Sequence, residues 1–265
     1  NTLKTNKLMA CVCIKTSSGA TKGTSLTLTD FVSDIYSTAY VVSKNSVLKL
    51  SGTKILLAVN NPDSEKKSKV IVLDINETTI TKKSAVIFSG YVNLGACTML
   101  RMDDTHVVIT YGKSSTNDSL YNKYVSVLTI VDDTVSLLVE KKTSVYASED
   151  TVNLKMVIDK ADANTAYALT SYNKRDGTTL LRIRIDYDAA NIAFTILNID
   201  TGSNGAASVN CVKVLNASKL LIAYIKTVSL ENTSYYVRAY SIVNVTASTL
   251  SVIETKICNK DENEA

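Results

Sequence analysis

The run Leu48-Lys49-Leu50-Ser51-Gly52-Thr53-Lys54-Ile55-Leu56-Leu57-Ala58-Val59 contains two short apolar stretches separated by a turn. Small turn residues between aliphatic stretches are typical of a β-hairpin. The same order recurs at residues 100–111 and 212–224, and again, with a longer insertion, at residues 154–169. A worn copy opens the chain, with residues 3–4 as its first strand and residues 8–12 as its second. The hairpin is therefore an internal repeat.

Each copy continues in the same way after the hairpin. A polar loop is followed by a strand with alternating polarity, such as residues 70–75, 125–130 or 237–242, and by a last strand such as residues 84–88. Four short strands rich in β-branched residues predict one antiparallel sheet per copy. The basic residues of the first strands are 45 to 58 residues apart, and one fifth of the 265 residues is 53.

A four-stranded sheet cannot bury both of its faces alone, whereas sheets stacked around an axis bury one another. We therefore predict one all-β domain, a five-bladed β-propeller of four-stranded antiparallel blades, with blades near residues 1–43, 44–93, 94–146, 147–203 and 204–265. The sequence resembles a β-propeller over its whole length, by period and pattern. A many-stranded β-sandwich is the alternative, but it does not predict fivefold copying. Closure of the ring would pair Leu3-Lys4 near Val252-Ile253, at an exposed edge.

Composition and charge exclude several classes of protein. Apolar residues make up 45% and charged residues 20% of the chain, which predicts a folded core. The net charge is +4, and lysines alternate with acidic residues, which argues against a nucleic-acid binder. The longest apolar run, residues 8–14, is too short for a membrane span. The start at Asn1 predicts a processed product or excised domain, and we expect a secreted protein or one on a virion or particle surface.

The cysteines have no metal-binding spacing, and no histidine pair accompanies them. We predict that they are small buried thiols. They are Cys11, Cys13, Cys97, Cys211 and Cys258.

The first candidate site is the basic position of each first strand. In a propeller these strands lie nearest the axis, so the cations would form a ring that binds an anion. The alternative is that each cation packs between blades and reaches solvent or an acidic neighbour. The residues are Lys49, Arg101, Lys155 and Lys213, with Lys4 in the worn copy; Asp103, Asp104 and Asp159 are the nearby acids.

The second candidate site is a tyrosine that lies eight or nine residues before a first strand. In a propeller the connections between blades and the loops between second and third strands share one face, where ligands usually bind. Aromatic faces with hydroxyl tips suit sugar rings, and they also suit wedging between blades. The residues are Tyr40, Tyr91 and Tyr146.

Catalytic motifs are weak in this sequence. His106 is the single histidine, and it occupies a strand position that lysine takes in other copies. No nucleophile elbow, phosphate-binding loop, dinucleotide fingerprint or EF-hand is found, so we expect no enzyme, catalytic residue, cofactor or metal. Five-bladed propellers include glycoside hydrolases with paired carboxylates, which leaves that activity as a minor alternative. The carboxylates concerned are Asp103, Asp104, Glu149, Asp150 and Asp159.

In repeat style and composition the sequence resembles the binding propellers of secreted lectins and of phage tail fibres or receptor-binding proteins. The resemblance implies a non-catalytic recognition module that binds glycans or anionic cell-surface polymers at several weak sites. The alternative is a structural or protein-interaction propeller whose partner docks on the polar loops at residues 60–68, 112–119 and 226–234.

Overall fold

The computed structural model describes residues 9–16, 19–27, 46–59, 68–76, 79–114, 122–146, 156–171, 177–199, 209–230 and 233–258. These residues form one two-stranded and four four-stranded antiparallel sheets, each from strands consecutive in the chain. We number the sheets I to V in chain order. Sheet I pairs β1 (Met9–Thr16) with β2 (Gly19–Thr27).

The four-stranded sheets have the strand order predicted for propeller blades. Sheet II contains β3 (Val47–Ser51), β4 (Lys54–Val59), β5 (Lys69–Asn76) and β6 (Thr79–Ile87). Sheet III contains β7 (Tyr91–Arg101), β8 (His106–Ser114), β9 (Asn122–Val131) and β10 (Thr134–Tyr146). Sheet IV contains β11 (Met156–Lys160), β12 (Thr165–Ser171), β13 (Thr178–Asp186) and β14 (Asn191–Ile199). Sheet V contains β15 (Val209–Asn216), β16 (Lys219–Leu230), β17 (Thr233–Val245) and β18 (Leu250–Cys258).

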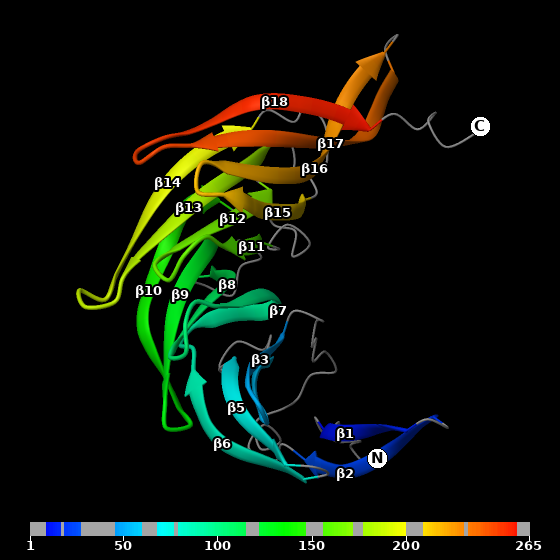
Figure 1. Ribbon diagram of the computed structural model, residues 1–265, viewed down its shortest axis with the longest axis vertical. Coiled ribbons are helices and arrows are strands. Elements are labelled where there is room, and N and C mark those ends of the chain that lie inside the picture. Colours follow the sequence, from blue (N-terminus) through cyan, green and yellow to red (C-terminus); the bar gives the residue numbers. More distant parts are fainter. Residues whose placement is uncertain are drawn as a thin grey trace.

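The sheets follow one another along an arc (Figure 1). Their first strands, β3, β7, β11 and β15, lie on the inner side of the arc and contact one another in sequence. Their last strands, β6, β10, β14 and β18, lie on the outer side and also contact one another. This arrangement confirms the all-β propeller class of fold with four-stranded antiparallel blades. The number of five blades and their boundaries stay predictions.

The hydrophobic core is divided into layers between neighbouring sheets. One cluster joins sheets II and III through Leu56, Val72, Phe88 and Tyr111. Two further clusters lie between sheets III and IV and between sheets IV and V. A fourth lies on the opposite face of sheet II and contains Leu57 and Ile71 among others. Burial between sheets is the reason why a repeated amphipathic sheet stacks instead of folding alone.

Sheet I takes an outer place in the arc. Both β1 and β2 contact β6, the outermost strand of sheet II. In the next sheet it is the last strand, β10, that makes the corresponding contacts with β5 and β6. The hairpin is therefore in an outer position, and the prediction that residues 8–12 form an inner second strand is wrong.

The repeated tyrosine that ends the second-strand motif has a common structural role. The hydroxyl groups of Tyr111 and Ser126 are 2.8 Å apart inside sheet III, and those of Tyr224 and Ser241 are 2.9 Å apart inside sheet V. Both tyrosines are fully buried, so each phenol needs a partner within the sheet. This pairing gives a physical reason for part of the sequence repeat.

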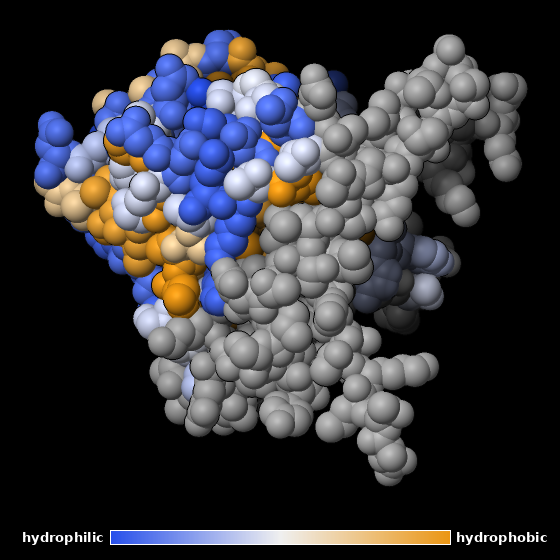
Figure 2. All heavy atoms as spheres, turned by 90° about the horizontal axis from the view of Figure 1, so that it is seen from below, coloured by the Kyte–Doolittle hydropathy of each residue, from blue (hydrophilic) through white to orange (hydrophobic). Residues whose placement is uncertain are grey.

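The surface of the described residues is mixed. Apolar side chains reach it between hydrophilic ones, as Figure 2 shows for the face seen from below. The prediction of buried thiols holds for Cys97, whose pKa burial raises to about 12. It is wrong for Cys211 and Cys258, which are exposed in sheet V. No helix among the described residues is long and apolar enough to cross a membrane.

Candidate functional site

The two predicted sites lie at opposite ends of the sheets. In β7, Tyr91 is the first residue and pairs with Ser114, whereas Arg101 is the last and pairs with Val107. These two partners are seven residues apart on β8, since 114 − 107 = 7. At ~3.3 Å per residue this separates them by ~23 Å. Tyr91 and Arg101 therefore cannot contact one small ligand together.

Arg101 and Lys213 each bind the neighbouring sheet. Arg101 donates to the carbonyl oxygen of Leu50 in sheet II, and its Nη2 lies 2.5 Å from Oδ1 of Asp104 in its own turn. Lys213 Nζ lies 3.1 Å from Oδ2 of Asp159 in sheet IV. These are the contacts of the packing alternative, in which each cation links two blades. Anion binding by these residues stays a prediction.

In sheet IV a different lysine occupies the basic position of the first strand. In sheet IV, Lys160 pairs with Ala166, just as Arg101 pairs with Val107 and Lys49 with Ile55. Lys160 also donates to a carbonyl oxygen of the preceding sheet, that of Met102. The alignment of Lys155 with Arg101 is therefore wrong. That of Lys213 is displaced by one residue, because Val214 pairs with Leu220 at the matching position and Lys213 pairs with Leu221. Lys155 and Lys4 lie outside the described residues, and the side chain of Lys49 is exposed.

The predicted tyrosines are only partly described. Tyr40 lies outside the described residues. Tyr91 is half-buried at the start of β7, where Ser68 Oγ donates to the carbonyl oxygen of Val92 at 2.6 Å. Tyr146 ends β10 and pairs with Asn122. A sugar-binding role of these three residues stays a prediction.

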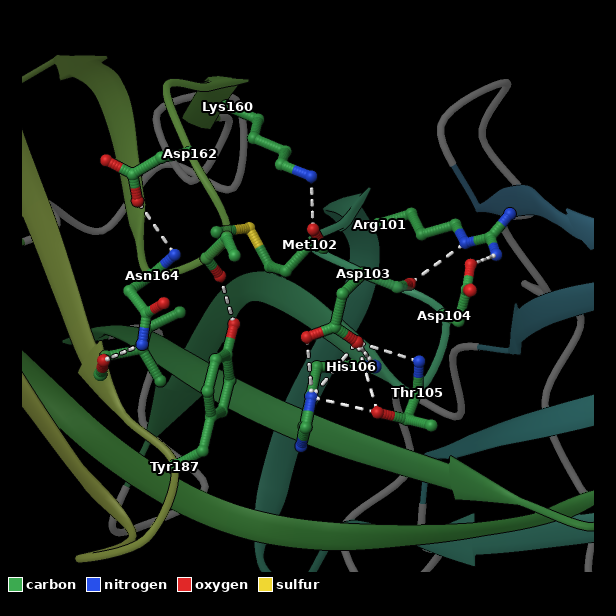
Figure 3. Close-up of polar contacts among 12 residues, drawn as sticks. Arg101, Met102, Asp103, Asp104, Thr105, His106, Lys160, Asp162, Asn164 and Tyr187 are labelled. Carbon is green, nitrogen blue, oxygen red and sulfur yellow. Dashed lines mark hydrogen bonds and ion pairs between the residues drawn. The ribbon is translucent and has the colours of Figure 1, made fainter.

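A polar cluster surrounds His106 at the tight-turn end (Figure 3). Asp103 accepts hydrogen bonds from the backbone N–H groups of Thr105 and His106, both at 2.7 Å, and its Oδ2 lies 2.8 Å from Nδ1 of His106. The imidazole stacks on Tyr187 of sheet IV with ring centroids 3.9 Å apart. Burial opposes ionisation of Asp103, but these hydrogen bonds outweigh it and lower its pKa. The cluster fixes the β7–β8 turn against sheet IV.

One buried lysine also links two sheets. Lys123 in β9 is fully buried, and its Nζ lies 2.5 Å from Oγ1 of Thr170 in β12. Burial disfavours the ammonium form and lowers the pKa of Lys123 to about 7. The side chain is closed to solvent, so we assign it to the interface between sheets III and IV and not to a binding site.

An extension of sheet V is the accessible feature that the sequence reasoning missed. β15 pairs with β16 only as far as Tyr224, and β18 pairs with β17 only as far as Arg238. Beyond these residues β16 and β17 pair only with each other among the described residues, from the Lys226–Val237 pair to the Leu230–Thr233 pair. This two-stranded extension, residues 226–230 and 233–237, projects from the sheet (Figure 1). We call it the arm.

The arm carries two exposed tyrosines on opposite faces. Tyr235 is 49% exposed and Tyr236 is 64% exposed. Arg238, also exposed, lies two residues from Tyr236 and therefore on the same face. Lys226 pairs with Val237, which places it on the face of Tyr235.

Residues 226–234 had been read as a polar loop, and this reading is wrong for the described ones, which are strands. The alternating pattern of Tyr235, Val237 and Ala239 was the available signal.

Groups of three or more His, Cys, Asp or Glu side chains able to hold a metal are not found among the described residues.

No family model and no curated protein matches the sequence. Ten solved chains match the structure, among them two of NanB. One, a complex of NanB with optactamide, has 11% sequence identity and a TM-score of 0.43 over 78% of this chain and 28% of that chain. A mutant of NanB sialidase from Streptococcus pneumoniae has 12% identity and a TM-score of 0.46 over 88% of this chain and 41% of that chain. The chain thus spans less than half of either protein.

These matches correct one prediction. The sequence led us to expect a chain that is not an enzyme, whereas two of the solved structures similar to it are of the sialidase NanB. Absence of catalysis is therefore no longer part of the interpretation. At these identities and TM-scores the likeness says nothing about substrate or catalytic residues in this chain.

Proposed function

We propose that this chain recognises acidic glycans or other anionic cell-surface polymers, and that the arm provides the main contact. The observation that supports the proposal is that an exposed tyrosine of the arm shares each face with a cation, which lies in the arm on one face and at its base on the other. Tyr236 and Arg238 share one face, and Tyr235 and Lys226 share the other.

The chemistry of both faces suits a charged sugar. A tyrosine ring packs against the C–H face of a pyranose, while its hydroxyl group hydrogen-bonds to water or to the sugar. The planar guanidinium of Arg238 can bind a carboxylate, sulfate or phosphate group with two parallel hydrogen bonds. A lysine supplies a point charge to the same kind of group. Neutral glycans would use the tyrosines alone and bind more weakly.

The position of the arm agrees with a binding role. The arm extends from the end of sheet V where second and third strands are joined, which is the loop end of the sheets. Tyr91 lies at the same end in sheet III. Weak sites on different sheets would reinforce one another on a repetitive polymer through avidity.

The test is binding to immobilised acidic glycans and anionic polymers at low and high salt. We expect added salt to weaken binding, and Arg238→Gln to weaken it by roughly tenfold or more, as for the loss of a charge-assisted hydrogen bond. Tyr236→Ala should weaken binding to acidic and neutral sugars alike. Lys219→Gln, an exposed lysine at the far end of β16, is the matched control and should change nothing.

The same glycans are then recovered and analysed for cleavage products, so that binding and hydrolysis are read separately. Equal binding by Arg238→Gln and Tyr236→Ala would contradict the assignment to the arm.

A protein partner is the second candidate function, and the free edges of the arm favour it. Between Val237 and Thr233, β17 has no neighbour other than β16 among the described residues. An extended peptide could add a strand at such an edge through backbone hydrogen bonds. The N–H of Val237 points towards β16, since Val237 pairs with Lys226 in the alternation set by the Val245 N–H to Ser218 carbonyl hydrogen bond, whereas the N–H of Ser234 points outward. Ser234→Pro would therefore block strand addition by removing an outward N–H donor while leaving the charges in place. Loss of partner binding in this variant with intact glycan binding would separate the two functions.

A further inference from the structure

The outermost strand of sheet V is exposed along nearly its whole length. Leu250 of β18 is buried, and residues 251–258 are all exposed. Ile253 is 57% exposed and Ile257 is 41% exposed. β18 ends the strand order of sheet V, and it lies at the outer edge of the arc (Figure 1). No described strand pairs with its outer edge, so the outer N–H and C=O groups of β18 are open to another strand in the part of the chain that the structure describes.

The sequence of this edge is complementary to itself. When two copies of β18 run antiparallel with Thr255 opposite Thr255, Glu254 of each copy lies opposite Lys256 of the other. In the same register Ile253 lies opposite Ile257. Opposite charges and aliphatic pairs directly across neighbouring strands are both favourable, whereas like charges are unfavourable.

Within one chain the same charges are already arranged for this pairing. Glu254 and Lys256 lie on one face of β18, with Oε1 and Nζ 3.3 Å apart, and both side chains remain more than half exposed, at 54% and 59%. A second copy would add a Lys256 to each Glu254 and complete a square of alternating charges. Edge lysines ordinarily discourage strand pairing, but here the charge is neutralised by the partner copy.

We infer that two copies of this chain associate through β18, which joins their V sheets into one continuous eight-stranded sheet about a twofold axis at Thr255. The interface is isologous, since the same surface is used by both copies. A β-bulge between the Ile242 and Val243 pairs of β17 and β18 falls at Ile253. The regular part of the shared edge therefore begins at residue 254, so the Glu254–Lys256 pairs lie within it and the Ile253–Ile257 pairs lie at its margin.

The other outer strands do not offer the same complementarity. In β10, the register that places Glu140 opposite Lys142 puts Lys141 opposite Lys141. Lys141 is also engaged by sheet IV, where it donates to the carbonyl oxygen of Ile192. In β6 the charges are the neighbouring Lys82 and Lys83, which repel in a self-pairing. The charge complementarity of β18 is thus absent from β6 and β10.

The test uses charge-reversal variants. Light scattering after gel filtration measures the molar mass of each variant over a range of concentrations. Glu254→Lys places lysine opposite lysine twice per dimer, and Lys256→Glu places glutamate opposite glutamate twice. Each single variant should weaken dimerisation by at least about tenfold. The double variant E254K/K256E restores opposite pairs and should dimerise like the parent chain.

An equimolar mixture of the two single variants gives the most decisive comparison. Both charge pairs between unlike copies are then complementary, so the mixture should dimerise where neither component does. Thr81→Lys, at an exposed position of β6, is the matched control and should leave the dimer intact. Circular dichroism of every variant checks that the fold is retained.

A parent chain that stays monomeric at all concentrations would overturn the inference, and would leave pairing of β18 with Leu3-Lys4 of its own chain as the alternative. A dimer that the two reversals do not weaken would overturn it equally. The dimer is detected by its molar mass, so this test does not depend on glycan binding. A dimer would present two arms and so raise avidity for a polymer.

Discussion

Stability should depend on pH through the buried amine of Lys123. Burial lowers the pKa of this group from 10.5 to about 7 in the folded chain. Between these values the unfolded chain holds a proton that the folded chain has released, so stability rises with pH. In this range the free energy of unfolding increases by ~1.4 kcal/mol per pH unit for one proton.

Between pH 7 and pH 9 the lysine dominates this pH dependence. From the upper end of this window the thiol of Cys97 opposes it, because its pKa is raised from 9.0 to about 12 in the folded chain and the unfolded thiol ionises first. Over two pH units the free energy of unfolding should therefore increase by roughly 2–3 kcal/mol. Lys123→Met should abolish this increase and raise stability at pH 7, because the penalty of a buried amine disappears.

Urea unfolding followed by circular dichroism at pH 7, 8 and 9 measures this change. The control is Lys219→Met, which removes an exposed lysine and should keep the parent slope. A parent chain whose stability is flat over this window, or a Lys123→Met variant with the same slope as the parent, would refute the reasoning.

Three further variants test the contacts between and within sheets. Lys213→Met removes the exposed partner of the Lys213–Asp159 ion pair and should cost ~0–1 kcal/mol. Asp159→Ala also removes the acceptor of the Val214 N–H and should cost ~1–3 kcal/mol by urea unfolding; equal costs would contradict the cross-sheet role of Asp159. Tyr111→Phe leaves buried polar groups of sheet III without their phenol partner and should cost ~1–3 kcal/mol. A variant as stable as the parent chain in thermal unfolding would argue against a stabilising role of the Tyr111 hydroxyl group. Asp103→Ala removes the acceptor that fixes the β7–β8 turn and should destabilise by ~1–3 kcal/mol, with faster hydrogen exchange at the turn amides as the local readout.

The repeat could be predicted because its determinants are local. Turn residues such as those at 51–53 and the alternation of residues 70–75 dictate hairpins and strand faces with no knowledge of the rest of the chain. Order within a sheet follows from short connections, which force consecutive strands to be antiparallel neighbours. The class of fold is the result of these local rules applied several times.

The alignment failed in sheet IV for a physical reason. Leu154-Lys155-Met156 matches the sequence pattern of Leu100-Arg101-Met102, but register is decided by the turn. In that turn the N–H of Ala161 donates to the carbonyl oxygen of Thr165 at 2.9 Å, and the N–H of Asn164 donates to Asp162 Oδ1 at 2.8 Å. These contacts place Lys160, five residues later, at the matching position.

The sequence by itself determined the strands, the sheets and their stacking as propeller blades, because these follow from periodicity and turn chemistry. Only the tertiary structure decided that Lys123 is buried, that cations bridge sheets, and that the arm and β18 stay exposed. Burial and exposure depend on which strands end first and on what the neighbouring sheet supplies, as at Arg238, where pairing with β18 stops. Such facts join residues distant in the chain, and no local pattern contains them.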